Sequence, residues 1–116
     1  MMFTLIRAEQ AEKTYQELRA QALKSLENRI KNKKAKVSPI EGLFKQVHKT
    51  LELLQQNPRH PGLQTHAYDA IPNPISPKEK VFEAYAQHRT PGAYRVFWCY
   101  GPGKGEMTII AITPHP

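Results

Sequence analysis

The stretch between Arg7 and Val37 constrains the fold most, because it contains neither glycine nor proline. Its apolar residues recur every three or four positions, which places them on one side of a helix. These residues are Ala11, Tyr15, Leu18, Ala22, Leu26 and Ile30. The stretch closes with the basic run RIKNKKAK, and cations suit the C-terminal end of a helix dipole. The sequence therefore predicts a long amphipathic helix with a solvated basic end, although the same run is also a candidate patch for RNA phosphates.

A second helix is predicted to begin in the segment SPIE. Ser38 suits the N-cap, Pro39 suits the first helical position, and Glu41 completes a capping box. The apolar side of this helix consists of Ile40, Leu43, Phe44, Val47, Leu51 and Leu54. Asn57 and Pro58 end it. Two helices joined by a short link are expected to pack as an antiparallel hairpin.

The remainder of the chain has the pattern of strands and turns. FTLIR at residues 3–7 predicts a first strand, and KVFEAYAQ, YRVFWCY and MTIIAIT predict three more after the helices. Residues 58–79 contain five prolines and predict an extended loop, held by anchors such as Leu63, Tyr68 and Ile71. The order predicts an α+β fold in a single domain, residues 1–116: an N-terminal strand, an α-helical hairpin and a three-stranded antiparallel meander in one curved sheet.

The glycine-rich GPGKG between the last two predicted strands does not meet the requirements of a phosphate-binding P-loop. Lys104 is followed by Gly105 rather than by Ser or Thr, and the next segment is strand-like rather than helical. A hairpin turn is predicted there instead, with Lys104 as a solvated charge. Cys99 is the only cysteine, so no internal disulfide is expected, and its position between Trp98 and Tyr100 favours a small buried hydrophobe over a reactive thiol.

The charge balance bears on the partner rather than on the fold. The chain has 17 Lys and Arg against 10 Asp and Glu, a net charge of +7. This surplus favours nucleic acid or an acidic protein as partner, although it can also serve solubility alone. The start MMFTLI is too short for the core of a signal peptide, and no stretch approaches the ~20 apolar residues of a membrane span. A cytoplasmic protein is predicted.

Several segments, in their order and spacing, carry a resemblance to a known family. LQQNPRHPGLQTHAY follows the second predicted helix, KVFEAY precedes AYRVFW, and the chain closes with IIAITPH. Over nearly its whole length it resembles the RelE/ParE superfamily of bacterial type II toxins, often labelled plasmid-stabilisation proteins. The resemblance implies a RelE-like curved sheet with a cleft and an antitoxin as partner. It also implies either cleavage of mRNA in the ribosomal A site or poisoning of DNA gyrase.

The chain departs from the family pattern in three places. The helical region, from Ala8 to Asn57, is longer than in compact members, and the proline loop at 69–78 is expanded. Several ribonuclease members have an aromatic residue after the closing histidine, whereas this chain has Pro116.

Metal-free cleavage of RNA requires a base, an acid and cations that stabilise the charge of the transition state. Arg95 shares one side of its strand with Phe97 and Cys99, so it either snorkels at the edge of the core or points into a cleft. The resemblance favours the cleft, because Arg95 matches the family's Tyr-Arg position. His115 is by itself an exposed terminal histidine; by resemblance it is a candidate acid or base. Glu83 is a candidate general base, or else a solvent-facing residue of an edge strand.

Further basic residues flank the strand that contains Glu83. Lys78, Lys80 and Arg89 are candidates for RNA binding, and equally ordinary surface charges. The remaining histidines, at 48, 60, 66 and 88, lack the spacing of a zinc site, so neither a metal nor a cofactor is predicted. His66 is expected to anchor the linker through hydrogen bonds.

The prediction is therefore the toxin of a type II toxin–antitoxin system, acting on mRNA as a metal-independent, ribosome-dependent endoribonuclease. Two alternatives stay open: a gyrase-inhibiting toxin without catalysis, and a degenerate, non-toxic relative that only binds an antitoxin.

Overall fold

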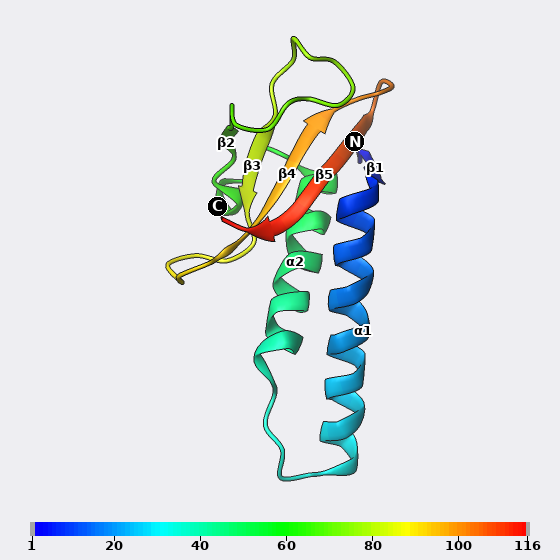
Figure 1. The fold of residues 1–116 in the computed structure, drawn as a ribbon, viewed down its shortest axis with the longest axis vertical. Coiled ribbons are helices and arrows are strands. Elements are labelled where there is room, and N and C mark those ends of the chain that lie inside the picture. The colour runs from blue at the N-terminus through cyan, green and yellow to red at the C-terminus, as the bar shows by residue number, and fades with distance from the viewer. Residues whose placement is uncertain (1, 116) are drawn as a thin grey trace.

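The computed structural model describes residues 2–115 and contains one five-stranded sheet with two helices packed on one face (Figure 1). Its elements in chain order are β1 (Thr4–Arg7), α1 (Glu9–Lys31), α2 (Pro39–Gln56), the short 3-10 helix η1 (Pro61–Leu63), β2 (His66–Ala67), β3 (Phe82–Tyr85), β4 (Tyr94–Tyr100) and β5 (Glu106–Pro114). The predicted α+β class, the helical hairpin and the final antiparallel meander are confirmed.

The strand order in the sheet is β1-β5-β4-β3-β2. β1 lies parallel to β5 at one edge, and the other neighbours are antiparallel. Strand β2 was not expected, since two residues inside a proline-rich segment show no periodicity. It pairs His66 with Glu83, so β3 is an interior strand and Glu83 does not lie on an edge strand.

Local hydrogen bonds account for the start of α2 and the end of α1. The expected capping box is present, because the backbone N–H of Ser38 donates to Glu41 Oε2 at 3.0 Å. Helix α1 ends at Lys31, six residues before Val37, because Asn32 starts a turn in which its Oδ1 accepts from the Lys34 N–H at 3.2 Å. No helix within residues 2–115 is long and apolar enough to cross a membrane.

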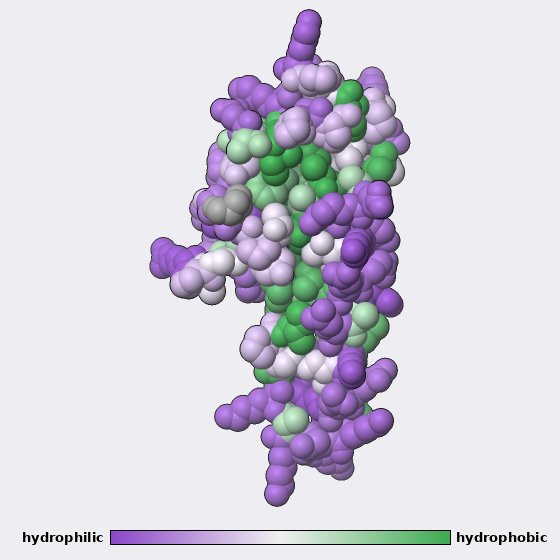
Figure 2. Space-filling model, in the orientation of Figure 1, coloured by the Kyte–Doolittle hydropathy of each residue, from purple (hydrophilic) through white to green (hydrophobic). Residues whose placement is uncertain are grey.

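The core lies between the sheet and the part of the hairpin beneath it. Alternate residues of β4, such as Val96 and Trp98, face Val47 and Leu54 of α2, and all four are buried. The hairpin continues past the sheet (Figure 1), and its far end leaves Leu23, Ile30 and Val37 exposed. Figure 2 shows hydrophilic side chains crowding this far end, whereas apolar surface is concentrated over the sheet and between the helices.

The sheet face away from the helices carries the other alternate residues. Tyr68, from the proline-rich segment, packs on Phe97 with ring centroids 4.8 Å apart. Cys99 is fully buried on this face, and burial raises the pKa of its thiol, as expected for a small hydrophobe rather than a nucleophile. The proline-rich segment therefore covers one end of the open face and leaves the other end, near the β3–β4 turn, for polar groups.

Candidate functional site

The three predicted catalytic residues lie together on the open face of the sheet. Glu83 is only 1% exposed, and its Oε2 lies 2.8 Å from His115 Nδ1 and 3.9 Å from Arg95 Nε. Its other oxygen, Oε1, lies 2.7 Å from His66 Nε2. We refer to Glu83, Arg95, His115 and His66 as the Glu83 cluster.

Strand pairing brings these residues together. β3 and β4 place Tyr85 opposite Arg95, and β2 places His66 opposite Glu83. His115 follows β5, and its backbone N–H donates to the carbonyl of Ala93 at 2.8 Å, which holds the end of that strand beside β4. Residues separated by up to 49 positions along the chain (from 66 to 115) thus converge through backbone hydrogen bonds.

Arg95 is held rigidly. Its guanidinium lies 3.7 Å from the centre of the Tyr85 ring, and its Nη1 donates to the carbonyls of Gln87 at 2.7 Å and Tyr94 at 3.2 Å. The residue is 8% exposed, and its Nε is buried without a hydrogen bond. A planar cation stacked on an aromatic ring loses little orientation when a second anion approaches. Arg95 therefore supplies a fixed positive charge beside the two imidazoles.

The hydrogen-bond partners assign protons to the histidines. An ionised carboxylate only accepts, so His115 Nδ1 carries a hydrogen and its Nε2 is left as an acceptor. His66 faces acceptors on both sides, since Nδ1 lies 3.1 Å from the carbonyl of Gln64 and Nε2 faces Glu83. A ring with hydrogens on both nitrogens matches this pair of acceptors. Their side chains are 48% (His66) and 47% (His115) exposed, so solvent meets the imidazoles and not the carboxylate.

The three predicted RNA-binding residues are not part of this cluster. Lys78 and Lys80 precede β3 and line a hollow of about 650 Å³ that contains none of the cluster's four residues. Arg89 follows β3 and is exposed in the β3–β4 turn, with a backbone φ of +56°. The lysines and Arg89 therefore lie beyond opposite ends of one short strand.

His66 is the member that sequence reasoning did not assign to the site. It was expected to anchor the linker through hydrogen bonds, and its bond to Glu83 confirms the anchoring. The segment Leu-Gln-Thr-His contained the signal, but the register of an unpredicted two-residue strand decides that this histidine meets Glu83.

Within residues 2–115, no group of three or more His, Cys, Asp or Glu residues is arranged to hold a metal ion. The geometry of the Glu83 cluster accounts for this in part, because each carboxylate oxygen is directed at a ring nitrogen. The carboxylate lone pairs that face the imidazoles accept from ring N–H groups and are therefore not free to bind a cation.

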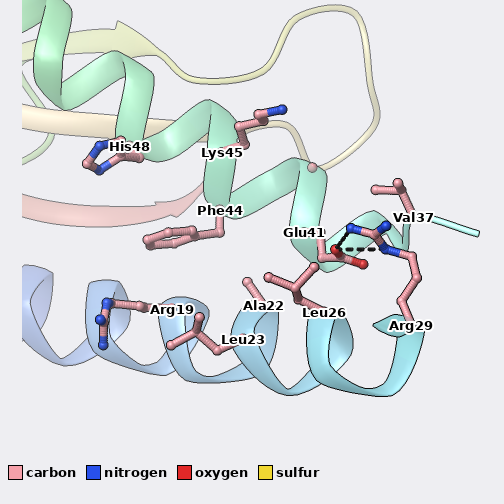
Figure 3. A pocket seen from close by; sticks show the side chains of 11 residues that line it. Arg19, Ala22, Leu23, Leu26, Arg29, Val37, Glu41, Phe44, Lys45 and His48 are labelled. Carbon is pink, nitrogen blue, oxygen red and sulfur yellow. Dashed lines mark hydrogen bonds and ion pairs between the residues drawn. The ribbon is translucent and has the colours of Figure 1, made fainter. Parts of the chain in front are cut away.

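A second hollow lies at the far end of the hairpin, between α1 and α2 (Figure 3), with a volume of about 380 Å³. Its lining is mainly apolar: Ala22, Leu23, Leu26, Val37 and Phe44. Arg19, Lys45 and His48 also line it. At one end Arg29 donates to Glu41 Oε1 from Nη2 at 2.9 Å and from Nε at 3.2 Å, as Figure 3 shows. We call this the hairpin groove.

No protein-family model and no curated protein matches the chain. Two solved structures match it over essentially its whole length. The structure of the YoeB dimer from Staphylococcus aureus matches with a TM-score of 0.52 and 10% identity, covering 100% of both chains. A copper-bound mutant toxin from Helicobacter pylori matches with a TM-score of 0.50 and 15% identity, covering 98% of this chain and 96% of that one.

At such identities the likeness is one of fold. The chain shares the fold of these two structures, and the RelE-like fold expected from the sequence is confirmed. A likeness in fold does not assign functions to the residues of the Glu83 cluster, so those functions are argued below from the geometry of this chain.

Proposed function

We propose that the protein is the toxin of a type II toxin–antitoxin system and cleaves mRNA on the ribosome without a metal ion. The observation that carries the proposal is the Glu83 cluster: two half-exposed imidazoles, a buried carboxylate between them and a fixed guanidinium. These are the acid, the base and the cation that RNA cleavage requires. The toxin fold and the net charge of +7 support the same conclusion.

In the proposed reaction, His115 Nε2 takes the proton from the ribose 2′-hydroxyl. The 2′-oxygen then bonds to phosphorus while the bond from phosphorus to the 5′-oxygen breaks. In this step Nδ1 of a protonated His66 gives up its hydrogen bond to the Gln64 carbonyl and returns its proton to that 5′-oxygen, so the products are a 2′,3′-cyclic phosphate and a 5′-hydroxyl. Arg95 stabilises the additional negative charge on the phosphoryl oxygens.

Glu83 has a different part from the one expected. A carboxylate that is 1% exposed does not reach a substrate hydroxyl, so it acts as a positioning residue. Its two oxygens orient the rings of His115 and His66, as the carboxylate of a Ser-His-Asp triad orients its histidine.

The test is induced expression followed by mapping of mRNA 5′ ends, with Arg95→Ala as the variant. The proposal expects growth arrest and new 5′ ends within translated mRNA, both lost in the variant. Arrest that persists in the variant together with DNA breaks supports the gyrase-directed alternative. Absence of arrest in the wild type supports the non-toxic relative.

We propose an acidic amphipathic segment of an antitoxin as the occupant of the hairpin groove. Apolar side chains line the groove, cations surround it, and Glu41 is already neutralised by Arg29. The basic run at 29–36 adjoins it. A second copy of this chain would bring the same positive charges, so an acidic partner fits better.

A co-expressed antitoxin should relieve arrest by the wild type but not by a Leu23→Ser, Val37→Ser variant, because the lining loses apolar area. Gln21→Ser, on the same helix but outside the lining, is the control. Equal neutralisation of all three proteins would place the partner elsewhere.

A further inference from the structure

Three lysines that are distant in the sequence converge at the end of the sheet remote from the Glu83 cluster. Lys78 and Lys80 lie in the proline-rich segment and Lys104 lies in the β4–β5 turn, yet all three line the hollow of about 650 Å³. No ion pair within residues 2–115 includes any of them. Like charges that outnumber the opposite charges around them raise the energy of the free protein, and an anionic ligand relieves that repulsion.

The segment that presents these lysines is ordered. Asn73 is buried, and its Oδ1 accepts from the N–H groups of Ile75 at 2.9 Å and Ser76 at 3.0 Å. Its Nδ2 donates to the carbonyl of Lys80 at 3.3 Å. The lysines therefore stand on a fixed backbone rather than on a loose loop.

Two carboxylates lie nearby and do not cancel the charge. Glu79 lines the same hollow, which leaves the lysines in excess. Glu106 is engaged in the turn, since its Oε1 accepts from the Gly103 N–H at 2.8 Å. Three lysines against one carboxylate in the lining and a second beside it leave the hollow with a net positive charge.

An exposed aromatic ring lies in the same hollow. Tyr100 is 46% exposed, although it ends a strand whose preceding five residues are buried. Its neighbours Phe3, Phe82 and Trp98 meet it at interplanar angles of 47°, 77° and 83°, so none of them stacks parallel to its ring. A nucleic-acid base stacks on such a face, with about 1–3 kcal/mol per base in single-strand binding proteins.

A neighbouring hollow of about 430 Å³ shares Phe82 and Tyr100 with the lysine-lined hollow and is also lined by Arg59 and Trp98. The buried indole N–H of Trp98 has no hydrogen-bond acceptor within residues 2–115. The two hollows form one surface that is aromatic in the middle and basic at both sides, and we call it the Tyr100 surface.

We propose that the Tyr100 surface is a second binding site for single-stranded RNA, separate from the site of cleavage. Tyr100 stacks on a base, and Lys78, Lys80 and Lys104 neutralise the adjacent phosphates. Arg95 and Tyr100 are five residues apart on β4, about 17 Å, and their side chains lie on opposite faces of the sheet. RNA held here is therefore not at the Glu83 cluster, and the surface anchors the protein beside the nucleotides that are cut. This inference rests on the proposed function only in the choice of RNA as ligand.

The experiment measures binding apart from cleavage. A 2′-O-methyl oligoribonucleotide lacks the nucleophilic hydroxyl and is not cut, and Trp98, the only tryptophan, lies 4.9 Å from the Tyr100 ring and reports binding by fluorescence. Lys78→Gln, Lys80→Gln, Lys104→Gln in one protein should weaken binding by about tenfold or more and reduce the salt slope by about 2, at roughly 0.7 per phosphate. The matched control is Lys33→Gln, Lys34→Gln, Lys36→Gln at the end of the hairpin, which removes the same charge.

A second variant tests stacking. Tyr100→Ala should weaken binding by about 5- to 150-fold with an unchanged salt slope, whereas Tyr100→Phe retains wild-type affinity. Circular dichroism and thermal unfolding show whether each variant is folded.

Equal weakening by both triple variants, or unchanged affinity of Tyr100→Ala, overturns the inference. The inference is also overturned if polyglutamate competes as well as RNA for the protein and Tyr100→Ala does not change the affinity. That result would indicate a general contact with polyanions or acidic proteins. Glu83→Gln separates this inference from the proposed function, because that variant should bind the oligonucleotide normally. If the wild-type protein binds the oligonucleotide through Tyr100 but cuts no mRNA, the second binding site stands and the proposed nuclease function is contradicted.

Discussion

Two glutamates of this protein, Glu41 and Glu83, each bind an arginine, but their surroundings differ. Glu41, at the start of α2, accepts hydrogen bonds from Arg29, from Ser25 and from the backbone and side chain of Ser38. These donors, with Arg29 first and the Ser38 backbone second, lower the pKa of Glu41 to about 2. Glu83, on β3, has two histidines as its close partners and Arg95 at 3.9 Å.

The two glutamates differ in the kind of hydrogen-bond donor that surrounds them. Every donor around Glu41 keeps its proton through the physiological range, so that carboxylate only ties α1 to α2. Both close partners of Glu83 are histidines that are open to solvent, and imidazole is the side chain most often used as a general acid or base. A carboxylate among permanent donors stabilises a fold, whereas one among titratable donors can organise a reaction.

The largest effect should come from Glu83→Gln. One end of the amide donates rather than accepts, so one of the two imidazoles loses its orientation. Cleavage of mRNA on purified ribosomes should fall by about 10²- to 10⁴-fold, as when general acid–base catalysis is lost. The same change at Glu41 is the control, and cleavage by Glu41→Gln should be close to wild type. Equal cleavage by Glu83→Gln and Glu41→Gln would show that Glu83 has no special part in the reaction.

The next effect separates the two partners of Glu83. His66→Gln and His115→Gln should each reduce cleavage by on the order of 10²-fold. On a synthetic mRNA whose 5′-bridging oxygen is replaced by sulfur, the leaving thiolate needs no proton. The defect of His66→Gln should then largely disappear, while that of His115→Gln should remain. If the sulfur substitution rescues His115→Gln instead, His115 is the general acid and His66 is the general base.

A stability effect is expected at Glu41. Its pKa is lowered from 4.5 to about 2 on folding, so its stabilising contribution is complete above pH 4.5 and is lost as the pH falls towards 2. Glu41→Gln should lower the thermal midpoint at pH 7, and the difference from wild type should shrink steadily below pH 4.5. A difference that stays constant down to pH 3 would show that the hydrogen bonds do not depend on the charge.

The smallest effect is expected at Glu12, a third glutamate paired with an arginine. The hydrogen bond from Arg7 is the main cause that lowers the pKa of Glu12, but both side chains are considerably exposed, so water replaces the pair easily. Glu12→Gln should change the thermal midpoint less than Glu41→Gln and leave cleavage unchanged. A larger loss than at Glu41 would mean that the end of β1 depends on this pair.

Local signals in the sequence predicted the helices and the meander, because caps and apolar periods act over a few residues. The capping box at Ser38 and the stripe of α2 are examples. Strand β2 was not predictable in this way, since its two residues form a strand only because β3 offers them backbone partners.

The site was predictable in part for the same reason. Alternation along β4 grouped Arg95 with Phe97 and Cys99, and the resemblance then favoured a cleft for Arg95 and a role for His115, while Glu83 was a candidate as a carboxylate within the neighbouring strand. The burial of Glu83 and the presence of His66 both follow from β2, so neither could be read from the residues. The convergence of Lys78 with Lys104 depends on how the proline-rich segment folds back, which no local pattern specifies.

The parallel pairing of β1 with β5 has a consequence for synthesis. Residues 4–7 leave the ribosome well before their partners at 106–109, which lie 102 positions further along the chain (from 4 to 106). The sheet therefore closes, and His115 meets Glu83, only when translation of this region is complete. Until residues 106–115 have left the ribosome, β1 lacks its partner strand and Glu83 lacks His115, so the Glu83 cluster is incomplete on any shorter nascent chain.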